Sequence, residues 1–303
     1  MLLEPRGRSL VVHTPAKLNL FLEVLRKRDD GYHELETLMV SVGLYDTLTF
    51  TEEDSRRIRL RGFDAASQSG AGGSATSGLP LGGQNLVVQA AELLRKYAGV
   101  ERGVRIQLQK RIPVAAGLAG GSSDAAATLV ALNQLWNLKL TTGELLELAS
   151  QLGSDVGFFV SRSPAAICRG RGERVEPLDV PLGLHFIIVR PPSGLLTATV
   201  YRNCRPAANL RSVGTLVDLL RRGRLERAAR FLHNALGAAA ERLNPDLAHL
   251  KTLMSKEPVL GHLMSGSGSA YFGLCANRRQ ALWIAGRLRA ERVGSVYVVQ
   301  SRP

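Results

Sequence analysis

In the stretch Pro113-Val-Ala-Ala-Gly-Leu-Ala-Gly-Gly-Ser-Ser-Asp-Ala-Ala-Ala127, a glycine-rich turn runs directly into an alanine-rich helix start. Gly117, Gly120 and Gly121 allow backbone conformations that bulkier residues avoid, so consecutive amide N–H groups can converge on an anion. The helix that follows adds its positive end at the same place. The pattern therefore predicts phosphate binding, although a helix packed tightly on a sheet would also use these residues.

Two serines follow the glycines. Ser122 and Ser123 could give hydroxyls to a phosphate or to a metal ion bound to that phosphate. No Gly-Lys-Ser/Thr ends the loop, so it is not a Walker A sequence, and it lacks Gly-x-Gly-x-x-Gly spacing. The motif therefore indicates a phosphate-binding site but does not identify the molecule that carries the phosphate.

Composition is that of a globular protein of about two domains, with 303 residues, 45% hydrophobic and 21% charged. No apolar run approaches the roughly 20 residues that span a bilayer, and the first residues lack the apolar core of a signal peptide. We therefore expect a cytoplasmic protein. Cys168, Cys204 and Cys275 are odd in number and far apart, which favours reduced thiols over disulfides or a metal site.

The net charge of +13 favours polyanionic partners, either phosphorylated metabolites or nucleic acid. The densest arginine group, between Arg221 and Arg230, alternates with apolar residues at helical spacing, which favours a solvated helix face. Aromatic residues make up only 5% of the chain, so stacking platforms for single-stranded nucleic acid are sparse.

Mixed strand and helix patterns in both halves predict an α+β protein of two domains. The patterns also make two specific predictions. Leu10–Leu25 should form two short strands broken near Pro15, and Leu225–Leu236 should be one helix. The Gly-, Ser- and Ala-rich segment 63–84 should be a flexible surface loop.

Three segments resemble, in order, the three motifs of the GHMP kinases: Pro15-Ala-Lys-Leu-Asn-Leu20, the glycine loop, and Met264-Ser-Gly-Ser-Gly-Ser269. Asp30-Gly-Tyr-His-Glu34 and Gly153-Ser-Asp-Val156 are similar to the branch that phosphorylates 4-diphosphocytidyl-2-C-methyl-D-erythritol. The resemblance covers nearly the whole chain.

This resemblance implies a two-domain fold with the active site in the cleft. Residues 1–165 would form a domain similar to the second domain of ribosomal protein S5, and residues 166–303 a ferredoxin-like domain. The implied activity is ATP-dependent phosphorylation of the 2-hydroxyl of the cytidyl alcohol, in the non-mevalonate (MEP) isoprenoid pathway. ATP, Mg²⁺ and small-molecule substrates would be its partners, without nucleic acid or membrane, in a monomer or weak homodimer.

The resemblance also assigns the two catalytic residues. Asp155 is the implied base, and Lys17 would keep that carboxylate ionised and stabilise developing negative charge. From the sequence alone, Asp155 could instead be a helix N-cap or a solvated loop residue, and Lys17 a strand-edge lysine pointing to water.

Substrate residues follow from the same resemblance. Asn19 would orient the methylerythritol hydroxyls, and Tyr32 and His33 would bind the cytosine; the alternatives are a strand-end asparagine and ordinary packing. Other implied substrate contacts are Thr197, Tyr201, Arg202, Ser267 and Gly268, whose alternatives are an ordinary helix start and a bare β-turn.

For the nucleotide, Asn85 and Lys110 match positions bordering adenine and ribose, with helix capping and surface solvation as the alternatives. The implied phosphate residues are Pro113, Gly117, Leu118, Ala119, Gly120, Gly121, Ser122 and Ser123. No carboxylate cluster specifies protein ligands for Mg²⁺, which Ser122 or Ser123 could reach.

The chain departs from the family pattern at three places. Ala119 stands where many members have glycine, Ser269-Ala270-Tyr271 replaces a commoner Pro-Thr form, and segment 63–84 is long. Other readings are a homoserine or mevalonate kinase, which should lack the Gly-Tyr-His segment, an RNA-binding module, and a catalytically silent ligand sensor.

Overall fold

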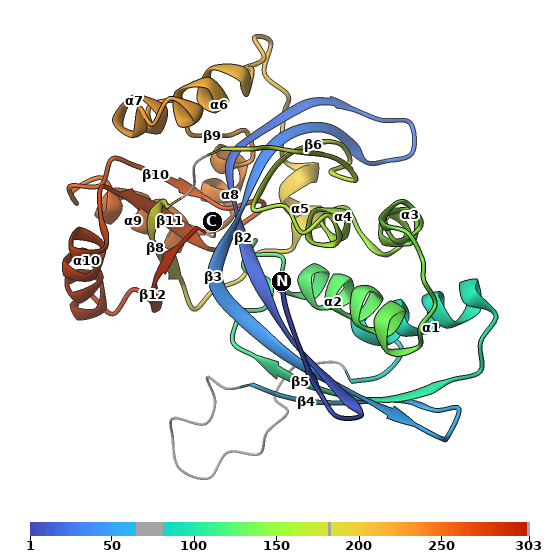
Figure 1. Cartoon of the computed structure of the whole chain (residues 1–303). Helices are drawn as coiled ribbons and strands as arrows, with labels where there is room; N and C mark the ends of the chain where they lie inside the picture. Colours follow the sequence, from blue (N-terminus) through green and yellow to red (C-terminus); the bar gives the residue numbers. More distant parts are fainter. Residues whose placement is uncertain (65–80, 181–182, 302–303) are drawn as a thin grey trace. The chain divides into compact units, whose positions relative to one another are not determined.

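The computed structural model describes residues 1–64, 81–180 and 183–301, and the chain divides into two compact units. The first unit contains residues 1–16, 44–113 and 119–162, and the second contains residues 17–43, 114–118 and 163–303. Two long strands, β2 (Ser9–Lys27) and β3 (His33–Glu53), contribute residues to both units (Figure 1). The predicted boundary at residue 165 stays a prediction.

In the first unit, β2 and β3 each pair with a further strand. β1 (Leu2–Arg6) is antiparallel to β2, and β5 (Gly103–Lys110) is antiparallel to β3 and parallel to β4 (Ile58–Asp64). Its helices are α1 (Leu86–Ala98), α2 (Gly120–Leu135), α3 (Thr142–Leu152) and α4 (Val156–Val160). Helix α2 packs against the other three, as Figure 1 shows.

Local signals explain where these helices begin. Asn85 caps α1 by accepting from the Val87 N–H at 2.9 Å, and Thr141 forms a capping box with Glu144 at the start of α3. Helix α2 is buried nearly all round because Ala125, Ala126 and Ala127 let its neighbours approach closely.

The second unit contains the strand pairs of the β2–β3 hairpin and a separate sheet. β6 (Ala165–Gly170) is antiparallel to β3 and to β7 (Arg174–Pro177), and β9 (His233–Asn234) is parallel to β2. The separate sheet has the order β10 (Gly261–Met264), β11 (Tyr271–Cys275), β8 (His185–Arg190) and β12 (Ser295–Gln300), with every neighbour antiparallel.

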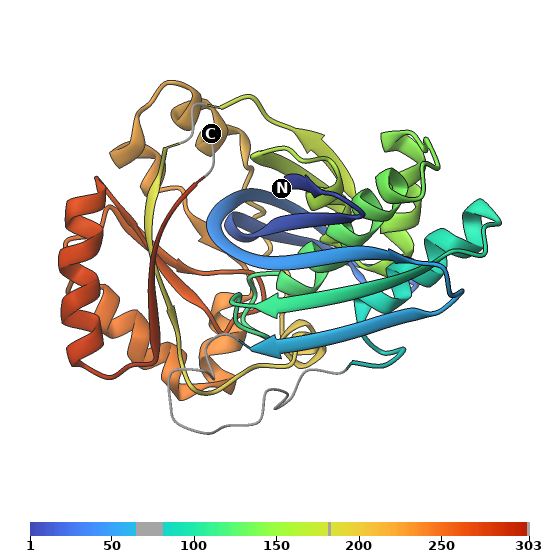
Figure 2. The same ribbon diagram turned by 60° about the horizontal axis from the view of Figure 1, so that its bottom comes forward.

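That strand order is the ferredoxin-like arrangement, in which the first strand of the sheet lies between the third and the fourth. Helix α10 packs on β8 and β12 (Figure 2). The helices of this unit are α5 (Thr197–Arg202), α6 (Gly214–Arg221), α7 (Leu225–Ala229), α8 (Gly237–Leu243), α9 (Pro245–Met254) and α10 (Arg278–Ala290). Ile187, Val189, Leu250 and Ile284 belong to its apolar core.

Two sequence expectations were wrong. The strand is not broken at Pro15, because the β1 ladder ends at His13 and proline's missing N–H removes no bond from it. The helix expected over Leu225–Leu236 ends at Ala229, since His233 and Asn234 leave the helical path to pair with Phe21 and Leu22 of β2.

Segment 63–84 is only partly described. Phe63 and Asp64 close strand β4, which corrects the expected start of the loop, and residues 65–80 lie outside the described part of the chain. Across the described ranges 1–64, 81–180 and 183–301, we find no helix with both the length and the apolar character needed to cross a membrane.

Candidate active site

The start of helix α2 in the first unit is built to leave its amides available. Ala119 is the N-cap residue, with a left-handed φ of 55°, and no side chain caps the helix. The first N–H groups of a helix have no partner inside it, so they can point at an anion. Alanine tolerates this φ less well than glycine does, so the chain accepts backbone strain at the position where it departs from the family pattern.

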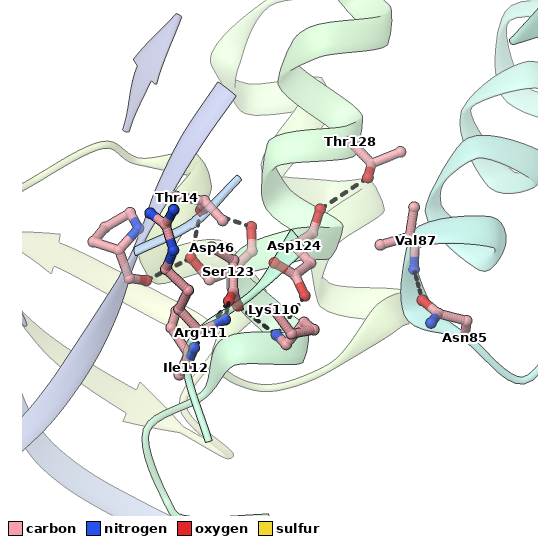
Figure 3. A network of polar contacts seen from close by, with 11 residues as sticks. Thr14, Asp46, Asn85, Val87, Lys110, Arg111, Ile112, Ser123, Asp124 and Thr128 are labelled. Atoms are coloured by element: carbon pink, nitrogen blue, oxygen red, sulfur yellow. Dashed lines mark hydrogen bonds and ion pairs between the residues drawn. The ribbon is translucent and has the colours of Figure 1, made fainter. Parts of the chain in front are cut away.

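The two serines of the loop lie differently. Ser123 is fully buried; its hydroxyl donates to the Pro15 carbonyl at 2.6 Å, and Thr14 donates to the Ser123 carbonyl at 3.0 Å (Figure 3). Ser122 is half-buried. The Ser123 side chain therefore anchors α2 to β2, and of the two hydroxyls that of Ser122 is the more accessible.

Lys110 lies in a buried ion cluster with Asp46 and Asp124 (Figure 3). Its ammonium donates to an Asp46 carboxylate oxygen and to Asp124 Oδ2, the latter at 2.7 Å, and its residue is only 4% exposed. The surface-solvation alternative for Lys110 is therefore wrong. Its predicted contact with the nucleotide stays a prediction.

The charges in this cluster shift one another's titration. Burial alone would lower the pKa of Lys110, but Asp124 and Asp46 outweigh it, and the pKa is raised above its ordinary value. Burial raises the pKa of Asp124 well above its ordinary value, and the attraction of Lys110 offsets only part of that rise. Asp124 Oδ1 is buried without a hydrogen-bond partner, so this carboxylate is the less well solvated of the two.

Asp155 and Asn85 also belong to the first unit. Asp155 is half-buried and occupies the N-cap position of α4, as the alternative reading expected, although its side chain makes no capping hydrogen bond there. Asn85 does cap α1, and this use of its side chain oxygen leaves its predicted role beside the nucleotide untested.

In the second unit, Lys17 of β2 is 3% exposed, which makes the alternative of a water-facing lysine wrong. Its ammonium donates to Asn19 Oδ1 at 2.5 Å and to the Gly117 carbonyl at 3.0 Å. Asn19 donates in turn to the Thr37 hydroxyl at 2.8 Å. Lys17 and Asn19 are thus brought together on one face of β2, joined to the first part of the glycine loop.

The loop that follows β10 packs against the same residues. Ser265 donates to the Gly117 carbonyl at 3.0 Å, and the Ala270 N–H donates to the Ala116 carbonyl at 2.9 Å. Gly117 has a φ of 72°, and a Cβ there would lie 2.1 Å from the Ser265 carbonyl oxygen. Only glycine fits this position, which agrees with the prediction that this loop needs backbone conformations that bulkier residues avoid.

The remaining predicted substrate residues lie nearby in this unit. The hydroxyls of Thr197, at the start of α5, and Ser267 are 2.9 Å apart, and the rings of His33 and Tyr201 are 5.3 Å apart. Gly268, with a φ of 82°, continues the loop after Ser267. The exposed Arg202 turns back along its own helix, donating to the Thr199 hydroxyl at 3.3 Å.

Tyr32 is 52% exposed at the tip of the β2–β3 hairpin, with the Arg171 guanidinium 4.8 Å from its ring centre. Partial burial lowers the pKa of His33, and the charge of Lys27 lowers it further. His33 therefore favours its neutral form at neutral pH, in which the ring both donates and accepts a hydrogen bond.

Sequence reasoning missed four residues that organise these clusters: Asp46, Asp124, Asn234 and Arg171. Asn234 donates to the carbonyls of Met264 and Gly266, each at 2.8 Å, and so holds the second glycine loop. Asp124 lies within the stretch 113–127. A charged residue in this otherwise alanine-rich helix start was the signal that could have identified it.

Comparisons with known proteins bear on both units. Residues 85–163 match the family of GHMP kinases N terminal domains, and residues 216–292 match GHMP kinases C terminal. A 4-diphosphocytidyl-2-C-methyl-D-erythritol kinase of Pelotomaculum thermopropionicum is 44% identical over 278 residues, covering 90% of this chain and 92% of that protein. The chain belongs to the 4-diphosphocytidyl-2-C-methyl-D-erythritol kinase family.

Other members of this kinase family agree. The relative of that name from Shouchella clausii is 41% identical over 267 residues, covering 87% of this chain and 84% of that protein. A crystal structure of 4-(cytidine 5'-diphospho)-2C-methyl-D-erythritol kinase has a TM-score of 0.80 at 36% identity, covering 97% of this chain and all of that one. A mevalonate kinase of L. major, at 16% identity and a TM-score of 0.72, covering 100% of this chain and 99% of that one, shares the fold.

Membership in the kinase family confirms the predicted α+β GHMP fold and the predicted enzyme class, a phosphotransferase with an alcohol acceptor. Over residues 1–64, 81–180 and 183–301, no group of three His, Cys, Asp or Glu side chains could hold a metal ion.

Proposed function

We propose that this protein transfers the γ-phosphoryl group of ATP to the 2-hydroxyl of 4-diphosphocytidyl-2-C-methyl-D-erythritol, in the MEP pathway to isoprenoid precursors. Relatives at 41–44% identity over most of their length carry the name of this activity. The observation that carries the proposal is the ammonium of Lys17, buried and fixed by Asn19 and the Gly117 carbonyl.

The chemistry needs an aligned acceptor, neutralised phosphates and a site for one proton. The acceptor oxygen forms a bond to the γ-phosphorus, the bond to the β,γ-bridging oxygen breaks, and ADP leaves. Asp155 takes the hydroxyl proton. Lys17 keeps that carboxylate ionised and stabilises the negative charge that develops on the transferring group.

The nucleotide's phosphates bind at the uncapped start of α2, where Gly120 and Gly121 lie, with Asn85 beside the adenosine. The site fits a phosphate because α2 offers first-turn amides that no side chain caps. Bound magnesium would neutralise charge on the phosphates, and Ser122 would be the loop side chain available to hold it, since the Ser123 hydroxyl donates to the Pro15 carbonyl.

The cytidyl alcohol binds through residues of the second unit. Tyr32, His33 and Tyr201 hold the cytosine, and Asn19 orients the methylerythritol hydroxyls. Thr197, Arg202, Ser267 and Gly268 contact the diphosphate and its neighbours. The domain bounds 1–165 and 166–303, the cytoplasmic location and the monomer or weak homodimer remain part of the same proposal.

The test uses purified protein, ATP, Mg²⁺ and the cytidyl alcohol, with ADP release and the 2-phosphate product followed together. We expect turnover by wild type and a loss of about 10²–10⁴-fold in kcat for Asp155→Asn. Asp54→Asn, whose side chain is 95% exposed, is the matched control and should keep full activity. Homoserine and mevalonate are offered in parallel as alternative acceptors, and a single-stranded RNA as an alternative ligand. Turnover of homoserine or mevalonate without turnover of the cytidyl alcohol, or full activity of Asp155→Asn, would reject the proposal.

A further inference from the structure

Asp46 of β3 accepts hydrogen bonds on both sides of its carboxylate. Oδ1 accepts from the backbone N–H groups of Arg111 at 2.6 Å and Ile112 at 2.9 Å, and Oδ2 accepts from the ammonium of Lys110. The residue is fully buried. These three donors belong to consecutive residues, so one side chain fixes the segment that enters the glycine loop.

Lys110 extends this hold to the start of α2. Its ammonium also donates to Asp124 Oδ2 (Figure 3). A Cβ on Gly120 would lie 3.0 Å from the ammonium nitrogen. The helix start is also anchored through Ser123 to Thr14 and Pro15. The first turn of α2 is therefore clamped from β2 and from the β3–β5 pair.

We propose that Asp46 is a positioning residue for nucleotide binding: through Lys110 and the Arg111 and Ile112 amides, it holds the first turn of α2 where that turn can receive phosphate. Lys110 then acts through the protein rather than on the nucleotide. This inference rests on the proposed function, because it takes the start of α2 as the phosphate site.

The two carboxylates of the cluster are not equivalent, and this makes the proposal testable. An amide at position 46 cannot satisfy both sides, because its NH₂ must face either Lys110 or the two backbone N–H groups. An amide at position 124 can, because Lys110 meets only Oδ2 and Oδ1 has no partner. Both substitutions exchange a carboxyl group for an amide of nearly the same shape, so their difference isolates the clamp.

The experiment measures the Kd of ADP with magnesium by calorimetry for wild type, Asp46→Asn and Asp124→Asn, together with each KM and kcat. We expect Asp46→Asn to weaken ADP binding about tenfold, or about 1.4 kcal/mol, and to raise KM for ATP in step. The KM of the cytidyl alcohol should stay within about twofold, as should every parameter of Asp124→Asn. Equal weakening in both variants, or an unchanged Kd in a folded Asp46→Asn protein, would overturn the proposal.

A second variant covers the case in which Asp46→Asn does not fold. Asp124→Ala leaves Asp46 and its three donors in place but removes the acceptor through which Lys110 holds the start of α2. It should bind ADP at least about threefold more weakly than Asp124→Asn, and equal binding by these two variants would count against the clamp. Failure of the proposed function looks different, since wild type itself would then not phosphorylate the cytidyl alcohol.

Discussion

Two buried lysines, one in each unit, differ in the contacts that each makes within its own unit. Lys110 donates to the carboxylates of Asp46 and Asp124, whereas the contacts of Lys17 within its own unit include an amide oxygen and a backbone carbonyl. Carboxylates balance a buried charge, while neutral oxygens orient an ammonium and carry no charge themselves. The contacts of Lys110 hold the backbone at the start of α2, whereas a catalytic role for Lys17 belongs to the proposed function.

The comparison is tested most strongly at Lys110. Lys110→Met leaves two buried carboxylates without their cation, so we expect unfolding by urea to show a loss of about 3–5 kcal/mol. Both carboxylates are almost completely buried, so water cannot replace the ammonium. A loss below about 1 kcal/mol would show that the cluster does not depend on the charge of Lys110.

In contrast to Lys110→Met, Lys17→Met should reduce turnover more than it reduces stability. Under the proposed function we expect kcat to fall about 10²–10³-fold, because the charge proposed to meet the transferring phosphoryl group is lost. The stability cost should be about 1–3 kcal/mol, the penalty for leaving Asn19 Oδ1 with one donor fewer; the Gly117 carbonyl keeps its bond from Ser265. Steady-state kinetics and urea unfolding on the same preparation check both values, and a variant that loses stability without losing kcat contradicts the assignment.

The sequence predicted what local signals encode. Asn85 caps a helix, which was one of its two predicted roles, and the glycine loop opens α2, because capping and left-handed turns depend on a few consecutive residues. The family resemblance added the second glycine loop, whose Ser265 does meet Gly117.

What the sequence could not show depends on partners far apart in the chain. Asp46 meets residues 64 to 66 positions away, and Asn234 meets residues 30 and 32 positions away. The two-residue strand β9 ends the expected helix only because β2 is beside it. Lys110 was assigned to the nucleotide by a motif, and its two carboxylates became visible only in the fold.

The smallest predicted effect is the pH dependence of stability that Asp124 contributes. Burial raises the pKa of Asp124, with Asp46 raising it further and Lys110 opposing, so the folded protein holds this proton more tightly than the unfolded chain, whose ordinary value is about 3.9. Stability from that proton is complete below about pH 4 and is lost as pH rises through the folded pKa. Asparagine cannot ionise, so the stability of Asp124→Asn relative to wild type should increase from pH 5 to pH 8, measured by urea unfolding. Asp54→Asn should show no such trend, and a difference that shrinks with pH would show that Asp124 is not the group that holds this proton.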